Sequence, residues 1–275
     1  MVERYAAFAD QGEGGNPAGV VVDAALPDPQ TMQRIAAEVG YSETVFAAPR
    51  GDAWRVRYFA PAMEVAFCGH ATVALGVALA RRRGDGLFHL RLNAGEAQVE
   101  GRYSPAEASA TLRSPPASSR PASPSALAEG LALFGWSRDD LAPDLPPAII
   151  NAGVDHLLLS VRDRETLAAM TYDLDAGRRF MEAQGLTTIS LVQAERPDLI
   201  HARNPFAAGG VYEDPATGAA AAALGGYLGR IGWPHAGEVT ILQGADMGQP
   251  CRLRVAIPTA PEDGVRVGGA VRQIV

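Results

Sequence analysis

The sequence predicts an α/β (α+β) protein with two similar halves. Each half is expected to be a mixed sheet around a buried helix. Three observations predict it. Short strand-like segments alternate with helical segments along the 275 residues. Two of the helical segments are apolar almost all round, and a helix without a polar face must be buried on every face. The order strand, loop, helix, strand also occurs twice at a constant offset of 149 residues.

The first half contains two expected helices. In the first, residues 30–39, Asp28 is the expected N-cap, Pro29 the first position and Gly40 the stop. The second, residues 70–83, is apolar until three arginines in its last turn, which suit the negative end of the helix dipole. Strands rich in aromatic and β-branched residues are expected at 4–8, 20–22, 44–47 and 54–59.

The second half follows a segment rich in serine and proline, residues 114–125, which has the composition of a linker. We therefore expect an N-terminal half of residues 1–113 with 264–275, and a C-terminal half of residues 126–263. Helices are expected at 126–134, 175–184 and 217–231. Strands are expected at 148–151, 156–161, 188–193, 239–242 and 252–257, the last two closing the chain.

The repeat indicates an ancient duplication. Small residues recur at equivalent positions of the two buried helices, where they let a sheet approach a helix closely. The matching pairs are Glu64 and Glu213, Gly69 and Gly218, Ala71 and Ala220, Ala74 and Ala223, Leu75 and Leu224, Gly76 and Gly225, Leu79 and Leu228, Arg81 and Arg230, and Gly95 and Gly244.

The composition excludes several classes of protein. A net charge of -7 argues against nucleic-acid or anionic-membrane partners, and no apolar stretch approaches the ~18 residues of a membrane helix. The chain has no lysine, which excludes pyridoxal-phosphate enzymes and P-loop nucleotide hydrolases. It has only two cysteines, Cys68 and Cys251, so we expect a reduced, cytoplasmic protein.

Both buried helices begin at a glycine-containing loop. Because the first N–H groups of a helix are unpaired and carry partial positive charge, two such starts facing each other across a cleft would bind a small carboxylate. The first loop reads Phe67-Cys68-Gly69-His70-Ala71-Thr72. The second reads Glu213-Asp214-Pro215-Ala216-Thr217-Gly218-Ala219.

Three side chains in or near these loops are candidates for chemistry. Glu43 precedes a buried strand, where burial can raise the pKa of a carboxylate and make it an acid/base catalyst; a solvated loop carboxylate is the alternative. His70, at a helix start, is suited to proton relay or is a half-buried structural histidine. Asp214 is suited to bind substrate, to cap the helix, or both. We interpret Cys68 as a small buried apolar residue, because the helix start near Thr217 has no second thiol to pair with it.

Taken together, an ordered set of short motifs resembles the PhzF family of phenazine-biosynthesis-like proteins, within the diaminopimelate-epimerase fold. Any one motif is weak, but their order and spacing match across nearly the whole chain. They are Gly15-Asn16-Pro17-Ala18-Gly19-Val20, Ser42-Glu43-Thr44-Val45-Phe46, Phe67-Cys68-Gly69-His70-Ala71-Thr72, Asn204-Pro205-Phe206, Glu213-Asp214-Pro215-Ala216-Thr217-Gly218, Gln243-Gly244 and Met247-Gly248.

The resemblance implies two pseudo-symmetric halves, each a curled sheet around a central helix, with the active site in the inter-domain cleft. It implies a cofactor-independent isomerase without a metal, often a homodimer, acting on a small carboxylate. In the phenazine enzyme a proton moves between ring carbons of trans-2,3-dihydro-3-hydroxyanthranilate. The family's essential glutamate then corresponds to Glu43, with His70 and Asp214 beside it in the catalytic set. Its substrate-binding positions are Gly69, Thr217, Gly218 and Ala219.

One departure bears on the substrate. The phenazine enzyme has a serine after the Thr-Gly pair, and this chain has Ala219, which keeps a backbone N–H but no hydroxyl. The substitution puts the phenazine substrate in question more than the proton chemistry. Two alternatives stay open: an amino-acid epimerase of the diaminopimelate epimerase type, and a non-catalytic binding protein on the same fold.

Overall fold

The computed structural model describes residues 1–93, 95–260 and 262–274, which divide into two compact units. The first unit comprises Met1–Arg113, Gln249–Arg252 and Gly268–Val275, and the second comprises Ser114–Gly248 and Leu253–Val267. The chain passes between the units after Arg252, inside strand β16 (Cys251–Ala256), and after Val267, inside strand β17 (Arg266–Gln273). Each of these strands therefore contributes to both units.

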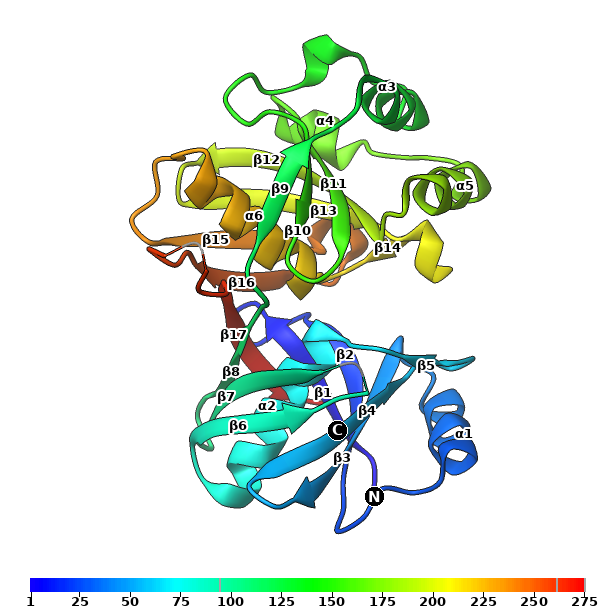
Figure 1. Cartoon of the computed structure of the whole chain (residues 1–275), viewed down its shortest axis with the longest axis vertical. Helices are drawn as coiled ribbons and strands as arrows, with labels where there is room; N and C mark the ends of the chain where they lie inside the picture. The colour runs from blue at the N-terminus through cyan, green and yellow to red at the C-terminus, as the bar shows by residue number, and fades with distance from the viewer. Residues whose placement is uncertain (94, 261, 275) are drawn as a thin grey trace. The chain divides into compact units, whose positions relative to one another are not determined.

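The first unit is a sheet wrapped around one helix. Its elements are β1 (Glu3–Ala9), β2 (Asn16–Val22), α1 (Pro29–Val39), β3 (Glu43–Arg50), β4 (Ala53–Phe59), β5 (Glu64–Val65), α2 (Gly69–Arg83), β6 (Gly86–Arg91), β7 (Glu96–Tyr103) and β8 (Ala108–Arg113). Strand pairings run from β1 through β2, β3, β4, β6, β7 and β8, and β17 pairs with both β8 and β1. The ring of pairings is therefore closed (Figure 1).

Helix α2 fills this ring. Every residue from His70 to Ala80 is buried, as its lack of a polar face predicts. Small side chains allow the close packing: a methyl group added at Gly76 would lie 2.6 Å from Val99 Cγ2 on β7. The helix starts at Gly69, one residue before the predicted start, and ends with the three predicted arginines.

Helix α1 follows its sequence signals closely. The Asp28 carboxylate accepts a hydrogen bond from the Thr31 N–H at 3.0 Å, Pro29 occupies the first turn, and Gly40 closes the helix with a φ of 73°. The buried face, Met32 and Ala36, packs against Phe46 and Phe59 of the sheet. Gly40 is thus the turn that directs the chain into β3 at Glu43.

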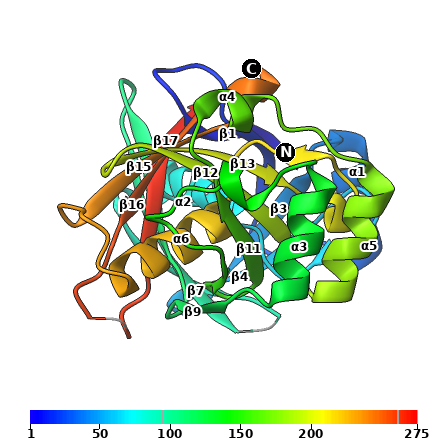
Figure 2. The same cartoon turned by 90° about the horizontal axis from the view of Figure 1, so that it is seen from above.

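The second unit repeats this plan. Its elements are β9 (Ser118–Pro121), α3 (Pro124–Leu133), β10 (Ala148–Asn151), β11 (Asp155–Ser160), α4 (Arg164–Ala168), α5 (Leu174–Gln184), β12 (Thr188–Arg196), β13 (Leu199–Pro205), β14 (Glu213–Asp214), α6 (Gly218–Arg230) and β15 (Glu238–Gln243), with short 3-10 helices at Arg138–Asp140, Ala207–Gly209 and Ala245–Met247. Helix α6 packs against β9, β10 and β11. Helices α3 and α5 lie side by side over the opposite face, where their apolar side chains form a second core (Figure 2).

The two units share one topology, as a duplication predicts. In the first, β4 pairs with β5 antiparallel and with β6 parallel, and α2 connects β5 to β6. In the second, β13 pairs with β14 antiparallel and with β15 parallel, and α6 connects β14 to β15. The preceding parallel pairs, β2 with β3 and β11 with β12, correspond as well.

Three features differ from the sequence expectations. The segment expected as a linker, residues 114–125, contains β9 and the start of α3, because Arg120 and its neighbours pair with β10. Strands β5, β6, β7, β8, β13 and β14 and helix α4 lie where no element was predicted. The strand at 252–257 is followed by a further one, β17, so it does not close the chain. Within the described residues, no helix has the length and apolar character to span a membrane.

Candidate active site

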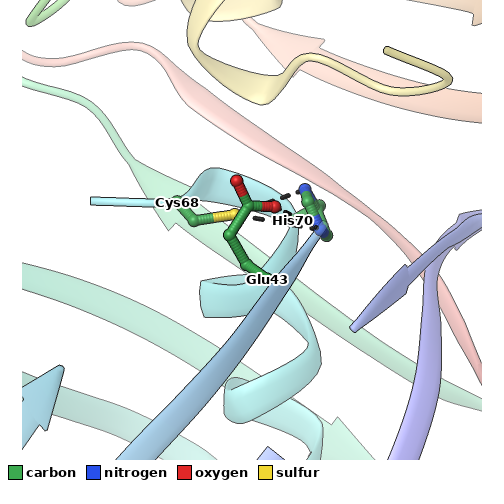
Figure 3. Close-up of side chains that lie close together, drawn as sticks. All are labelled: Glu43, Cys68 and His70. Atoms are coloured by element: carbon green, nitrogen blue, oxygen red, sulfur yellow. Dashed lines mark hydrogen bonds and ion pairs between the residues drawn. The ribbon is translucent and has the colours of Figure 1, made fainter. Parts of the chain in front are cut away.

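The first cluster of candidate residues lies where β3 begins and α2 begins. Glu43 is the first residue of β3, paired in register with Ala18 of β2. Cys68 is the N-cap residue of α2 and His70 is its second residue. Figure 3 shows the side chains of Glu43, Cys68 and His70 pointing toward one another. The predicted pair Glu43 and His70 is therefore brought together by the fold of the first unit.

The distances place these groups within reach of proton exchange. His70 Nε2 lies 3.4 Å from Glu43 Oε2, and Ser42 Oγ lies at the same distance of 3.4 Å from that nitrogen. The Glu43 side chain is 15% exposed, so the carboxylate can still be reached from solvent. A half-buried carboxylate next to an imidazole is suited to take a proton from a bound molecule and to give it back.

Cys68 contributes more to this cluster than the sequence interpretation assigned to it. The residue is buried, as predicted, but its sulfur lies 3.3 Å from His70 Nδ1 and 3.8 Å from His70 Nε2. The two cysteines are not joined in a disulfide. The spacing of the two residues did not signal this contact, because it depends on how the chain turns into α2 at Cys68.

A buried network holds the start of α2 behind this cluster. Thr72 Oγ1 donates to the Cys68 carbonyl at 2.7 Å and shares a 2.7 Å hydrogen bond with the Tyr58 hydroxyl. Burial raises the pKa of Tyr58 well above its ordinary range, which keeps the phenol protonated. The network therefore fixes the backbone from which Cys68 and His70 project.

The second cluster belongs to the second unit, where β14 leads into α6. The Asp214 carboxylate accepts a hydrogen bond from Thr217 Oγ1 at 2.7 Å. Thr217, not Asp214, is the N-cap residue of α6, and its side chain makes no capping hydrogen bond because it is turned to Asp214. Gly218 is the first residue of the helix, and Ala219 follows it, half-buried.

Gln243 secures this loop, a role that sequence reasoning did not assign. Its amide nitrogen donates to the Asp214 carbonyl at 2.7 Å, and its amide oxygen accepts from the Thr217 N–H at 3.2 Å. The side chain is only 2% exposed. The signal was present in the Gln243-Gly244 motif, but the sequence did not say which backbone groups the amide would reach.

A buried ion pair anchors the same loop to the sheet. Arg203 on β13 binds Glu213 on β14 through two hydrogen bonds, of 3.0 Å and 2.6 Å. Burial alone would lower the pKa of Arg203, but the hydrogen bonds and charge of Glu213 outweigh it and hold that pKa above its ordinary value. In the first unit Arg57 on β4 binds Glu64 on β5 in the same way, at 2.7 Å and 2.6 Å. The match of Glu64 with Glu213 in the repeat is thus a repeated ion pair.

Comparison with known proteins identifies the family. The model of the phenazine biosynthesis-like (PhzC-PhzF) family matches residues 5–272. The chain belongs to this family. An uncharacterized isomerase of Deinococcus radiodurans is 33% identical over 96% of this chain and 89% of its own. An uncharacterized isomerase of Bacillus subtilis, YfhB, is 28% identical over 94% of this chain and 91% of its own. Relatives of this kind place the chain among the isomerases of the phenazine biosynthesis-like family.

Solved structures agree on the fold. A PhzF-family protein of Bacillus anthracis superposes with a TM-score of 0.86 at 24% identity, covering 100% of this chain and 96% of that one. A predicted epimerase of Pseudomonas aeruginosa superposes with a TM-score of 0.84 at 26% identity, with the same coverage of 100% and 96%. A probable proline racemase of Agrobacterium radiobacter has a TM-score of 0.66 at 12% identity over 99% and 90% of the two chains, which is a likeness of fold.

Proposed function

We propose that this PhzF-family protein is a cofactor-independent isomerase that moves a proton between two carbons of a small carboxylate. The supporting observation is the pair of Glu43 and His70, which lie at the starts of β3 and α2. His70 Nε2 is 3.4 Å from Glu43 Oε2. Glu43 takes a proton from a carbon and returns it to another carbon of the same molecule. No oxidant or reductant is needed, because the electron pair of the broken C–H bond stays in the substrate.

The other residues have binding and positioning roles in this proposal. His70 holds the Glu43 carboxylate and a polar group of the substrate, and Asp214 binds a second polar group. The family resemblance gives substrate-binding roles to Gly69 and to Gly218 and Ala219, because backbone N–H groups at a helix start carry partial positive charge and suit a carboxylate. Thr217 holds Asp214 in place through its 2.7 Å hydrogen bond.

The test is proton NMR in D₂O. Trans-2,3-dihydro-3-hydroxyanthranilate is the first substrate, followed by conjugated hydroxy and amino carboxylates. We expect a product isomer and a shifted C–H signal for at least one of them. This chain has Ala219 where the phenazine enzyme has a serine. Turnover of the first compound, the phenazine substrate, is therefore the more demanding test. Binding without turnover, seen as thermal stabilisation by carboxylates that are recovered unchanged, would contradict an isomerase and favour a binding protein.

An epimerase is the alternative enzyme, since the fold is shared with a proline racemase. It would exchange deuterium at one carbon and invert its configuration, without moving a double bond. Two-thiol chemistry would need a second thiol at the start of α6, but Cys251 lies on β16, where its Sγ donates to the Gln249 carbonyl at 3.2 Å. A Cys68→Ala variant that loses all proton exchange while Glu43→Gln retains it would favour the epimerase.

The resemblance further implies a homodimer, which we retain as a proposal. Light scattering on the purified protein measures the mass directly, and the chain mass is 28.8 kDa. A single species of twice this mass is the expected result, and a monomer at all concentrations would contradict it.

A further inference from the structure

A chain of hydrogen bonds joins three buried polar side chains of the second unit. His156 on β11, Thr188 on β12 and Asn204 on β13 are each no more than 1% exposed. His156 Nδ1 lies 2.7 Å from Thr188 Oγ1, which donates to Asn204 Oδ1 at 3.1 Å. The three side chains lie on the face of the sheet toward α6, because the alternate residues Ile189 and Leu191 belong to the core on the opposite face.

The protons in this chain have one arrangement. Burial lowers the pKa of His156 to about 4, so near neutral pH the ring is uncharged and carries one N–H. The Thr188 hydroxyl has a single proton, which it donates to Asn204, so it accepts from His156 Nδ1–H. The Asn204 amide is therefore held with its oxygen toward Thr188 and its NH₂ group pointing away from it.

The NH₂ group of Asn204 makes no hydrogen bond to the part of the chain that the structure describes. The equivalent residue of the first unit is Tyr58, since each follows the arginine of its unit's ion pair. Tyr58 bonds to Thr72 on α2, but the repeat places Ala221 at that position of α6. An amide donor without a partner, in a side chain this buried, points to a ligand.

Asp214 lies beside this NH₂ group. Asn204 and Asp214 are directly opposite each other in the β13–β14 pair, so their side chains project from the same face with Cβ atoms about 5 Å apart. Asp214 is half-buried, and its carboxylate accepts from Thr217 Oγ1 but can accept further hydrogen bonds. The start of α6 therefore presents an amide donor next to a carboxylate acceptor, on a side chain that solvent can reach.

A hydroxyl group matches this pair, because its oxygen can accept from Asn204 while its proton is donated to Asp214. An ammonium group has donors alone, so it would bond to Asp214 and leave the Asn204 donor without a partner. We propose that Asn204, together with Asp214, binds a hydroxyl group of the substrate and so selects hydroxy carboxylates over amino carboxylates. Thr188 and His156 are positioning residues that hold the Asn204 amide. The turnover of such a substrate rests on the function proposed above, but its binding does not.

Binding is measured first, by calorimetry on the full chain. The probes are cyclohexanecarboxylate and its 2- and 3-hydroxy and 2- and 3-amino derivatives, each as cis and trans isomers. We expect wild type to bind at least one hydroxy acid about tenfold more tightly than both the parent acid and the matching amino acid, which is what one or two neutral hydrogen bonds contribute. Equal binding of the three kinds of acid, or no binding of any hydroxy acid, would overturn the proposal.

Asn204→Asp keeps an oxygen toward Thr188 and replaces the NH₂ donor with a second acceptor. It should lose the preference for the hydroxy acid and bind the amino acid more tightly than wild type does, a reversal that a loss of stability does not produce. Circular dichroism and melting curves verify that each variant is folded. A folded Asn204→Asp variant with the wild-type preference would overturn the proposal.

The Thr188 variants test the positioning role and decide the matter if Asn204→Asp does not fold. Thr188→Val removes the hydroxyl that holds the Asn204 amide and should reduce the preference for the hydroxy acid severalfold. Thr188→Ser is the matched control, because it retains the hydroxyl, and should keep the preference. Equal preferences in the two variants would show that the hydroxyl does not orient Asn204.

Turnover is measured next, on whichever hydroxy carboxylate wild type isomerises. Asn204→Asp should raise KM about tenfold and lower kcat less, because the hydroxyl is bound alike in the ground state and the transition state. A wild type that prefers hydroxy acids through Asn204 but isomerises nothing would support the binding residue and contradict the proposed function. Isomerisation with an unchanged KM in Asn204→Asp would overturn the binding residue and leave the proposed function, so the two failures can be told apart.

Discussion

At the scale of single residues, the cluster around Glu43 illustrates what a motif can and cannot predict. The motifs containing Glu43 and His70 predicted two residues of one site, and the fold of the first unit brings them to 3.4 Å. They did not predict the 3.3 Å contact of the Cys68 sulfur with His70, because that depends on how the helix start turns. The role of Gln243 was missed for the same reason: its partners are backbone groups of a loop remote in sequence.

A second residue, His156, sets a pH dependence of stability. It is fully buried on β11, its Nδ1 is 2.7 Å from Thr188 Oγ1, and burial lowers its pKa to about 4 while the neighbouring Asp155 charge opposes this only in part. A histidine in the unfolded chain has a pKa of about 6.5, so above this pH His156 is neutral in both the folded and the unfolded chain. As the pH falls from about 6.5 to about 4, the unfolded chain gains a proton that the folded chain does not, and stability drops by up to roughly 3 kcal/mol.

His156→Asn tests this, since the amide can still pair with Thr188 but does not titrate. We expect the free energy of urea unfolding to fall less steeply between pH 6.5 and pH 4 than in wild type. If the unfolding free energy depends on pH equally in the two proteins, His156 takes up a proton as readily in the folded chain as in the unfolded chain, which would contradict this prediction.

At the scale of elements, the repeated ion pairs give a matched comparison. The side chains of Arg203 and Glu213 are 8% and 3% exposed, and those of Arg57 and Glu64 are 18% and 27% exposed. Arg203→Met leaves a buried carboxylate without its partner, which costs about 3–5 kcal/mol. Arg57→Met should cost about 1 kcal/mol or less, because water and the Asn93 amide, which donates to Glu64 at 2.6 Å, remain available. Urea unfolding of both variants measures the difference, and equal losses would contradict the assigned burial.

The packing of α2 against β7 gives another element-scale prediction. A methyl group at Gly101 would overlap the Gly76 carbonyl of the helix, whereas one at Gly86, its cross-strand partner, would meet open space. Gly101→Ala must push the helix away from the strand, so we expect a loss of about 1–3 kcal/mol. Gly86→Ala should change the melting temperature little. Similar melting temperatures for both variants would show that α2 does not approach β7 so closely.

The elements that sequence analysis missed share a physical cause. Strands β6 and β7 carry charged and glycine residues and have an exposed face, and they pair with each other, with β8 and with β4. Strand β9 consists of Ser, Arg and Pro and forms because β10 offers it an open edge. Propensity is a weak guide where pairing with a distant strand decides the conformation. The two buried helices were predicted well because their apolar character leaves them no exposed alternative.

At the scale of the whole molecule, the order of the chain constrains how it folds. The first unit is completed by Gly268–Val275, where β17 pairs with β1 through Tyr5 and its neighbours. A fragment of residues 1–113 lacks this strand, so the ring around α2 stays open along β1 and β8. We expect the fragment to be unfolded or molten by circular dichroism and proton NMR. Cooperative melting of the fragment near the temperature of the full chain would contradict the closed ring.

The account as a whole depends on Glu43 as the group that carries the proton. The most direct measurement compares wild type with Glu43→Gln by proton NMR in D₂O, on whichever carboxylate wild type isomerises. The amide keeps the shape of the side chain but cannot take a proton, and a positioned acid/base supplies ~10²–10⁴-fold in rate. We predict a loss of kcat of at least about a hundredfold in a folded variant. A Glu43→Gln variant that isomerises at near the wild-type rate would contradict the account.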